Sequence, residues 1–330
     1  MKTVDISKYS NIDTSEMQEL VLAPLPDIVA DRVLQLDADI ACYECTYNEN
    51  DSLEECKNNL LTLIEKYRVY AGAERVVCHL TGKLKGNRYN IATVKPYQGN
   101  RTGKAKPKNL QAIRDWLVNA PKIQILNPTT GYYPEAWTWT KVEVYFNHLE
   151  EADDSLTQFH HNNPNSVLCS RDKDLRMNSG LHLNWDTFEL HEVDPFGYLE
   201  IKEYETKSGT KKRKVYGEGT LWFWFQMLAG DTADNIVGLP MIQGKTKMVK
   251  CGDIRAYEAI KNYIESTKYT GMSFDKNMYH FVFSLYKDYY SEDYDSEYAE
   301  DMLVEQAKLL WMRRHVGEDD VLNWFKEIGC

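Results

Sequence analysis

Residues 230–240 read Gly-Asp-Thr-Ala-Asp-Asn-Ile-Val-Gly-Leu-Pro and place two carboxylates, Asp231 and Asp234, three residues apart before a Gly-Leu-Pro turn. On a helix this spacing brings both side chains to one face. Carboxylate oxygens suit Mg²⁺, which takes a few acidic ligands and keeps several waters. Acids beside a turn also serve as solvated caps, so the pair alone leaves both interpretations open.

The preceding residues alternate short apolar runs with helical periodicity. Strands are predicted at 33–37, 75–80, 123–126, 142–146 and 166–170. Helices are predicted from the Ser52-Leu53-Glu54-Glu55 capping box, over 109–118 and from residue 151. Residues 127–139 are expected to form a loop. This alternation predicts an α/β fold, with a mostly parallel central sheet and helices on both faces.

Further acids follow the predicted strands, and ligands of such sheets bind beyond the carboxyl ends of the strands. Three of these acids lie within four residues, where mutual repulsion is costly unless a cation is present. We therefore expect the acids to meet at one rim and to bind metal. The upstream candidates are Asp37, Glu151, Asp153, Asp154, Asp172 and Asp174.

The charge pattern is uneven. The net charge is −11, which argues against general affinity for nucleic acid. Residues 81–108 nevertheless contain eight Lys and Arg residues and no acid, and smaller basic islands follow at 207–214 and 245–250. We interpret residues 81–108 as an irregular surface that follows a phosphate backbone.

The composition bounds the class of protein. A chain of 330 residues, 43% of them hydrophobic, can form one large or two smaller domains. No apolar run is long enough to span a membrane, and the polar N-terminus is no secretory signal. Seven scattered cysteines favour reduced thiols and a cytoplasmic protein, with Cys42 and Cys45 on one helix face.

The C-terminal part is predicted to be helical. Apolar patterns indicate helices over 222–228, 252–265 and 302–314. We expect a catalytic α/β core over 1–221 and a helical region over 222–330.

Several motifs together resemble the 5′ nucleases, which comprise phage 5′-to-3′ exonucleases, bacterial polymerase-I exonuclease domains and flap endonucleases. Residues 230–240 are similar to the metal-binding segment and helix–three-turn–helix entry of that family. Glu151-Ala152-Asp153-Asp154 resembles its acidic box, and Ser170-Arg171-Asp172-Lys173-Asp174-Leu175 its next acidic pair. Leu36-Asp37-Ala38-Asp39 resembles its first strand, and Tyr97-Gln98-Gly99-Asn100-Arg101 its arch. The likeness spans about residues 30–265 and is greatest to the phage exonucleases.

The resemblance implies a PIN-like core that hydrolyses DNA from 5′ ends, or at flaps, with two Mg²⁺ ions, for which Mn²⁺ can substitute. It assigns Asp37, Glu151 and Asp153 toward one ion. Toward the other it assigns Asp154, Asp172, Asp174, Asp231 and Asp234. Arg101 would bind the reacting phosphate, and Lys83, Lys85 and Arg88 would guide the single strand. Gly238, Gly244 and Lys245 would hold the duplex, with K⁺ at that hairpin. The expected protein is a monomer acting in phage or bacterial DNA replication, in the bacterial cytoplasm; an RNA–DNA hybrid is a second substrate to test.

This chain departs from the family pattern at three places. Thr81 stands where relatives carry an aspartate, Gln98 stands where they carry a lysine, and residues 241–245 read Met-Ile-Gln-Gly-Lys instead of Gly-Ile-Gly-Pro-Lys. A threonine hydroxyl brings no charge to a metal, although Asp39 is positioned to supply one. Two alternatives therefore stay open: a PIN-type ribonuclease, and a DNA-binding relative with weakened chemistry.

Overall fold

The computed structural model describes residues 25–101, 103, 105–119, 141–206, 208–267, 273–290 and 295–330. The strand predicted at 123–126 and the loop predicted at 127–139 lie outside these residues. Within the described part of the chain, none of the helices combines the length and apolarity that crossing a membrane requires.

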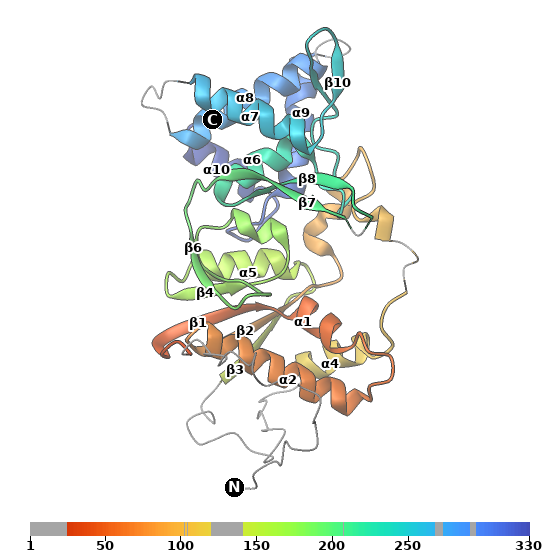
Figure 1. The fold of residues 1–330 in the computed structure, drawn as a ribbon, viewed down its shortest axis with the longest axis vertical. Helices are drawn as coiled ribbons and strands as arrows, with labels where there is room; N and C mark the ends of the chain where they lie inside the picture. The colour runs from red at the N-terminus through yellow and green to blue at the C-terminus, as the bar shows by residue number, and fades with distance from the viewer. Residues whose placement is uncertain are drawn as a thin grey trace, which may run out of the picture.

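A six-stranded sheet forms the centre of the N-terminal part, in the order β3-β2-β1-β4-β5-β6 (Figure 1). The strands are β1 (Val29–Asp37), β2 (Ala73–Leu80), β3 (Lys141–Phe146), β4 (Ser166–Cys169), β5 (Gly180–Leu183) and β6 (Leu190–Val193). All neighbours pair in parallel except β5 and β6. The prediction of a mostly parallel sheet is confirmed.

Helices cover both faces of this sheet, as predicted. On one face α1 (Ala38–Cys45), α2 (Leu53–Tyr70) and α4 (Leu110–Asn119) share a core with alternate residues of β1, β2 and β4. Cys42 and Cys45 are buried there. The predicted capping box of α2 is present, because the Ser52 hydroxyl accepts from Glu55 N–H while the Glu55 carboxylate accepts from Ser52 N–H.

The opposite face carries α5 (Ala152–His161), which packs on β1, β2 and β4. The contact there is polar. His79 on β2 lies between Gln35 on β1 and Ser155 on α5, with 2.8 Å to each partner. Burial lowers the pKa of this histidine to about 3, so the ring is neutral at pH 7.

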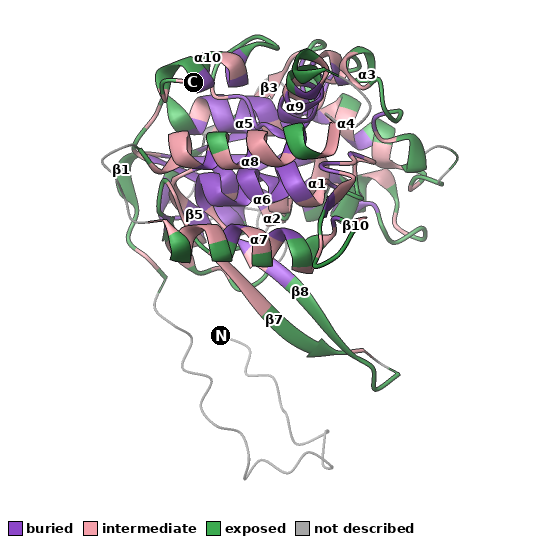
Figure 2. Ribbon diagram, turned by 90° about the horizontal axis from the view of Figure 1, so that it is seen from above, coloured by how far each residue is buried: buried purple, intermediate pink, exposed green. Residues whose placement is uncertain are grey.

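A second core surrounds α6 (Gly219–Ala229), which is buried from Gly219 to Leu228 (Figure 2). It is enclosed by α7 (Asp253–Ser266), α8 (Phe274–Tyr290), α9 (Ser296–Leu310) and α10 (Asp320–Glu327). The indole rings of Trp311 and Trp324 stack at 4.4 Å between centroids. This core also contains Leu156 of α5 and Leu168 of β4, so it joins both sides of the predicted boundary at residue 221. The domain division stays a prediction.

The remaining elements are short. Residues 81–108 contain η3 (Lys85–Asn87), α3 (Arg88–Ile91) and η4 (Gly99–Arg101), joined by irregular segments. The hairpin of β7 (Leu199–Glu205) and β8 (Lys211–Gly217) extends from the body with an exposed tip, as Figure 2 shows. Between α6 and α7, an Asp231–Ile236 bridge precedes a second hairpin of β9 (Met241–Gln243) and β10 (Met248–Lys250).

Candidate metal centre and nucleic-acid site

Asp37 occupies the carboxyl end of the central strand. It is the last residue of β1 and caps α1, since its carboxylate accepts the N–H groups of Asp39 and Ile40 at 3.1 Å. The Ser170 hydroxyl, just beyond β4, donates to it at 2.7 Å. Burial raises the pKa of Asp37 to about 6 despite these hydrogen bonds. The rim thus begins with a carboxylate that is costly to ionise in the absence of a cation.

Asp37, Asp153 and Asp172 form what we call the first acidic group. Asp153 lies in the first turn of α5, and Asp172 caps η6 (Lys173–Met177) after β4. Burial, together with repulsion from Asp172 and Asp37, raises the pKa of Asp153 well above its ordinary value. The Asp153 carboxylate makes no hydrogen bond or ion pair with any described residue. A divalent cation would relieve this repulsion.

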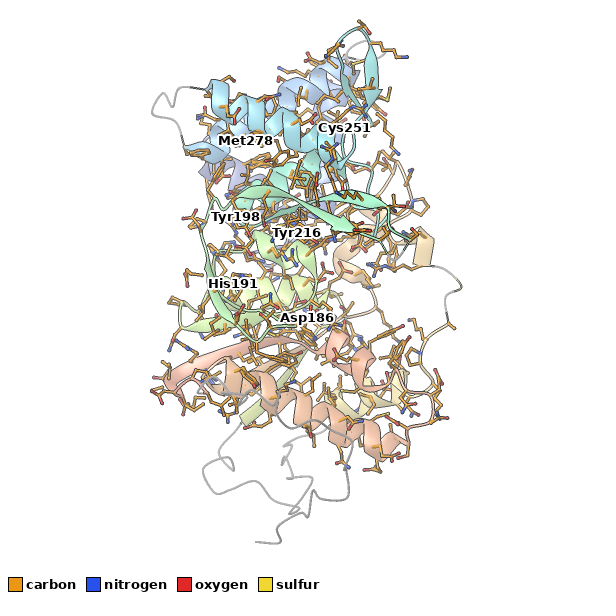
Figure 3. All side chains as sticks on the ribbon, viewed as in Figure 1. Asp186, His191, Tyr198, Tyr216, Cys251 and Met278 are labelled. Atoms are coloured by element: carbon orange, nitrogen blue, oxygen red, sulfur yellow. The ribbon has the colours of Figure 1, made fainter. Side chains whose placement is uncertain are left out.

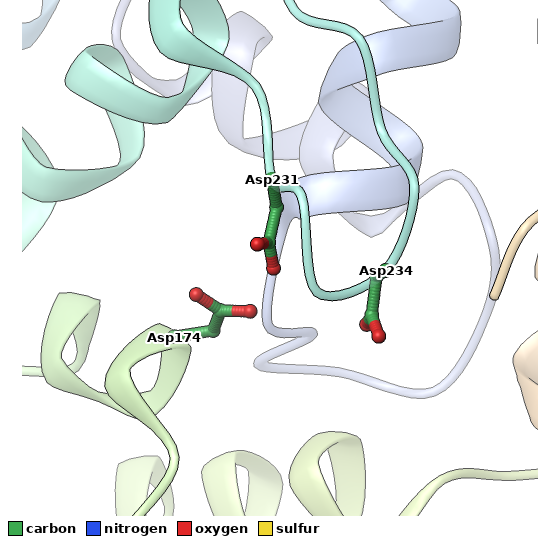
Figure 4. A group of neighbouring side chains, drawn as sticks. All are labelled: Asp174, Asp231 and Asp234. Atoms are coloured by element: carbon green, nitrogen blue, oxygen red, sulfur yellow. The ribbon is translucent and has the colours of Figure 1, made fainter. Parts of the chain in front are cut away.

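Asp174, Asp231 and Asp234 form the second acidic group, and one oxygen from each lies within 4.8 Å of the others (Figure 4). Lys173 Nζ lies 2.9 Å from Asp231 and 3.2 Å from Asp174. Burial and repulsion from Asp172 raise the pKa of Asp174, whereas the Lys173 ammonium outweighs burial and lowers the pKa of Asp231.

The side chains at the rim fit a hard divalent ion. Oδ2 of Asp231 is buried, and among the described residues no N–H or hydroxyl group donates to it; only a protonated Asp174 could offer it a proton. Asp172 repels both Asp37 and Asp231, so the charges of the two acidic groups interact with each other. An all-oxygen set of this kind selects Mg²⁺, Mn²⁺ or Ca²⁺ over softer metals.

Two of the predicted metal ligands have other partners. Asp154 is fully buried in a bidentate ion pair with Arg88, at 2.6 and 2.8 Å, and accepts from Arg313 N–H at 3.2 Å. Both of its oxygens are therefore already hydrogen-bonded to arginines, which argues against its assignment as a metal ligand. Glu151 contacts Arg88 at 2.9 Å and Lys85 at 3.2 Å, yet burial keeps its pKa raised, and its role as a metal ligand stays a prediction.

Arg88 is likewise wrongly predicted to guide DNA. Its side chain is 0% exposed, and it also donates to the carbonyl oxygens of Leu309 and Trp311. The guanidinium therefore joins the acidic box to the loop that follows α9. Because its donors are buried and hydrogen-bonded within the protein, Arg88 stabilises the fold and does not contribute to a DNA-binding surface.

The segment 97–101 packs on the turn that contains Asp234. The Tyr97 hydroxyl donates to Asp234 at 2.9 Å and contacts Glu151 at 3.0 Å, and Gln98 donates to Asp234 at 3.1 Å. Arg101 forms an ion pair with Asp234 while its side chain stays 47% exposed. The predicted phosphate ligand is thus placed beside the second acidic group, with its outer face open to solvent.

The other residues predicted to contact DNA differ in how exposed they are to solvent. Lys83 and Lys245 are exposed, and Lys85 is half-buried against Glu151. Gly238 is buried, and its N–H donates to Gln306 at 2.9 Å. The N–H of Gly244 donates to Lys247 across the β9–β10 turn. These two N–H groups are therefore not free for a phosphate, which corrects both predictions.

The Thr81 hydroxyl has a hydrogen-bond partner at the rim. Its Oγ1 accepts the N–H of Ala152 at 3.0 Å, at the start of α5. Asp39 accepts from Thr81 N–H at 2.9 Å and forms an ion pair with Arg114. Asp39 also belongs to α1 and not to β1, so the rule that alternate strand residues point to the same side does not relate it to Asp37. Arg114 already supplies the cation that Asp39 needs.

Three contributors at the rim were not predicted from sequence. Arg114 approaches from α4, the Ser170 hydroxyl fixes Asp37, and Lys173 lies between two acids of the second group. Only Lys173 could have been suspected from the sequence, because it lies between Asp172 and Asp174. Arg114 and Ser170 are far in the sequence from the acids that they contact, and only the folded sheet brings them to the rim.

No protein-family model matches this chain, and no curated protein matches it. Solved structures similar to it include a bacteriophage T5 flap endonuclease variant, described as a pseudo-enzyme–product complex with DNA and metal ions. That likeness has a TM-score of 0.45 at 15% identity and covers 90% of this chain and 97% of the T5 chain. A T5 structure co-crystallised with metal ions (TM-score 0.39, 14% identity) and a mutant T5 5′-exonuclease (0.38, 13%) each cover 84% of this chain, and 98% and 97% of their own. The roles proposed below for individual residues therefore rest on this chain's own side chains.

Proposed function

We propose that this protein is a divalent-metal-dependent nuclease that hydrolyses phosphodiester bonds of DNA at or near 5′ ends. The observation that carries the proposal is the meeting of two acidic groups at the carboxyl rim of a parallel sheet. Burial and mutual repulsion raise the pKa values of Asp37, Asp153 and Asp174, which supports a site that gains stability from a bound cation. Catalytic sites are common places for such groups.

The division of labour between the two groups follows from their partners. The first acidic group would hold one ion and the second acidic group the other, with Asp172 between them. Two ions held about 3.5–4 Å apart supply an activated water and stabilise the leaving oxygen in an in-line displacement. Asp37 is held by three hydrogen bonds, so its oxygens are oriented before any ion binds.

Substrate binding would use the exposed cations beside the rim. Arg101 would exchange its ion pair with Asp234 for the phosphate that reacts, which releases Asp234 toward metal. Lys83 would contact the strand from the basic segment, while Tyr97 and Gln98 keep the Asp234 turn in place. The preferred ion is Mg²⁺ with Mn²⁺ as a substitute, and the preferred substrate is DNA with a free 5′ end or flap.

The experiment is a gel assay of blunt, recessed, flapped and RNA–DNA substrates with labelled 5′ ends, with Mg²⁺ and with EDTA. Asp172→Asn should remove most turnover and leave DNA binding measurable. Glu143→Gln, an exposed acid on β3 away from the rim, is the matched control. Cleavage of RNA alone would favour the PIN-type ribonuclease. Metal-independent cleavage, or full activity of Asp172→Asn, would refute the proposal.

A further inference from the structure

A cavity of about 600 Å³ lies between the sheet edge and the β7–β8 hairpin, and one of its walls is Asp172 of the first acidic group. Asp186 and His191 line it from the sheet side, and Tyr198 and Tyr216 from the hairpin side, as Figure 3 shows. Cavities of 300–1,000 Å³ are typical of sites for small organic ligands. Its size suits one nucleotide, and it adjoins the place where the proposed reaction occurs.

A second hollow of about 490 Å³ shares Arg171, Asp172, Arg176 and Tyr216 with this cavity. It continues past Lys214 on β8, in the basic run Lys211–Lys214. That run belongs to the basic island at 207–214, which has no role in the proposed metal site. The two hollows therefore form one path that leads from the rim toward a cationic hairpin.

Arg176 is a cation on this path that has no partner among the described residues. Arg171 is paired with Asp186 at 2.6 Å, and Lys202 with Glu200 at 2.6 Å. Arg176 lines both hollows and makes no hydrogen bond or ion pair with the described residues. A guanidinium in such a place can bind a phosphate with two parallel hydrogen bonds.

The hairpin wall supplies aromatic faces. The Tyr198 side chain, just before β7, is 46% exposed. The Tyr216 ring has Lys202 at 5.0 Å and Lys214 at 5.3 Å from its centroid. Bases of single strands stack on exposed aromatic rings, and neighbouring cations bind the backbone without reading sequence. Phosphate-binding cations and a stacking surface are thus combined in one cavity.

We propose that this cavity binds one nucleotide of the substrate strand next to the reacting phosphate, with Arg176 on its phosphate and Tyr198 stacked on its base. The inference rests on the proposed function and adds a second strand contact, separate from that of Arg101. The occupant is part of a DNA strand, because the basic hairpin extends the path beyond one nucleotide.

The experiment uses the full chain and DNA with a 5′ single-stranded arm that carries 2-aminopurine at one of its first five positions. Ca²⁺ replaces Mg²⁺, and the absence of cleavage is checked on gels. In the wild type, one position should be quenched by stacking. Tyr198→Ala should abolish that quenching, and Tyr198→Phe should retain it. Arg176→Gln should weaken binding about tenfold and reduce the salt slope by about 0.7.

Arg75→Gln is the matched control for lost charge, since Arg75 is an exposed arginine of β2 that lies away from the rim. Equal affinity of Arg176→Gln and Arg75→Gln, or quenching that survives in Tyr198→Ala, would overturn the inference while leaving nuclease activity intact. A wild type that neither binds nor cleaves any DNA would instead overturn the proposed function.

Discussion

Two neighbouring aspartates should respond in opposite ways to the same substitution. Asp154 is paired with buried Arg88, whereas the charges that act on Asp153 are those of other acids. The Arg88 guanidinium outweighs burial and holds the pKa of Asp154 below its ordinary value; burial and repulsion raise that of Asp153. In metal-free protein, Asp154→Asn should therefore destabilise the fold and Asp153→Asn should stabilise it.

The size of the first effect follows from the burial of the pair. Removing one partner of a buried ion pair costs about 3–5 kcal/mol, because an uncompensated charge stays behind. Glu151 still contacts Arg88 at 2.9 Å, which places Asp154→Asn near the lower end, at about 3 kcal/mol. The entropy of unfolding is about 2.1 cal/mol/K per residue, so over 330 residues a loss of about 3 kcal/mol in unfolding free energy lowers Tm by about 4 °C.

The assay is urea unfolding in EDTA, followed by tryptophan fluorescence and repeated with Mg²⁺. Arg88→Met should resemble Asp154→Asn or exceed it, and the double variant should lose less than the sum of the single losses. Added Mg²⁺ should stabilise the wild type more than Asp153→Asn, in which only the second acidic group keeps all its carboxylates. Equal destabilisation by Asp153→Asn and Asp154→Asn in EDTA would refute the different roles given to the two carboxylates.

Three further predictions concern charge, pH and a helix start. Lys83→Gln should reduce the salt slope of DNA binding by close to one unit, measured by fluorescence anisotropy, whereas Arg88→Met should leave it unchanged because that side chain is 0% exposed. His79 has a folded pKa of about 3 against 6.5, so its stabilising contribution is complete above pH 6.5 and is lost as pH falls toward 3. Between pH 7 and pH 5 this histidine should lower the free energy of unfolding by about 2 kcal/mol. In His79→Gln, the free energy measured by urea unfolding should fall by about 2 kcal/mol less over the same range. Thr81→Val removes the acceptor for Ala152 N–H and should cost about 1 kcal/mol in the same assay, with Thr81→Ser as the rescue.

Much of the fold could be predicted from local patterns. The α2 capping box and the apolar run of β1 act within a few residues, so the sequence reveals them directly. The convergence of Asp37, Asp153 and Asp172 followed from one rule, that parallel strands share a carboxyl edge. The antiparallel strand β6 and the β7–β8 hairpin were missed, because their burial is partial and their apolar alternation is weak.

The errors at the site have a different cause. Successive residues of a helix point about 100° apart, so Asp153 and Asp154 cannot both face the rim. Counting acids in a row cannot show which one has a buried arginine behind it. Arg88 itself was counted among exposed cations because the loop that covers it comes more than 200 residues later, after α9. Gly238 was assigned to DNA although Gln306 of α9 uses its N–H.

The central claim, that the two acidic groups form a metal centre, is tested most directly by calorimetric titration of Mn²⁺ into the metal-free protein. Two ions per chain are predicted for the wild type, since each group offers a set of carboxylate oxygens. Asp172→Asn should weaken both, because Asp172 lies between the groups, while Glu143→Gln should match the wild type. A wild type that binds no Mn²⁺, or an Asp172→Asn variant that binds it unchanged, would contradict the account.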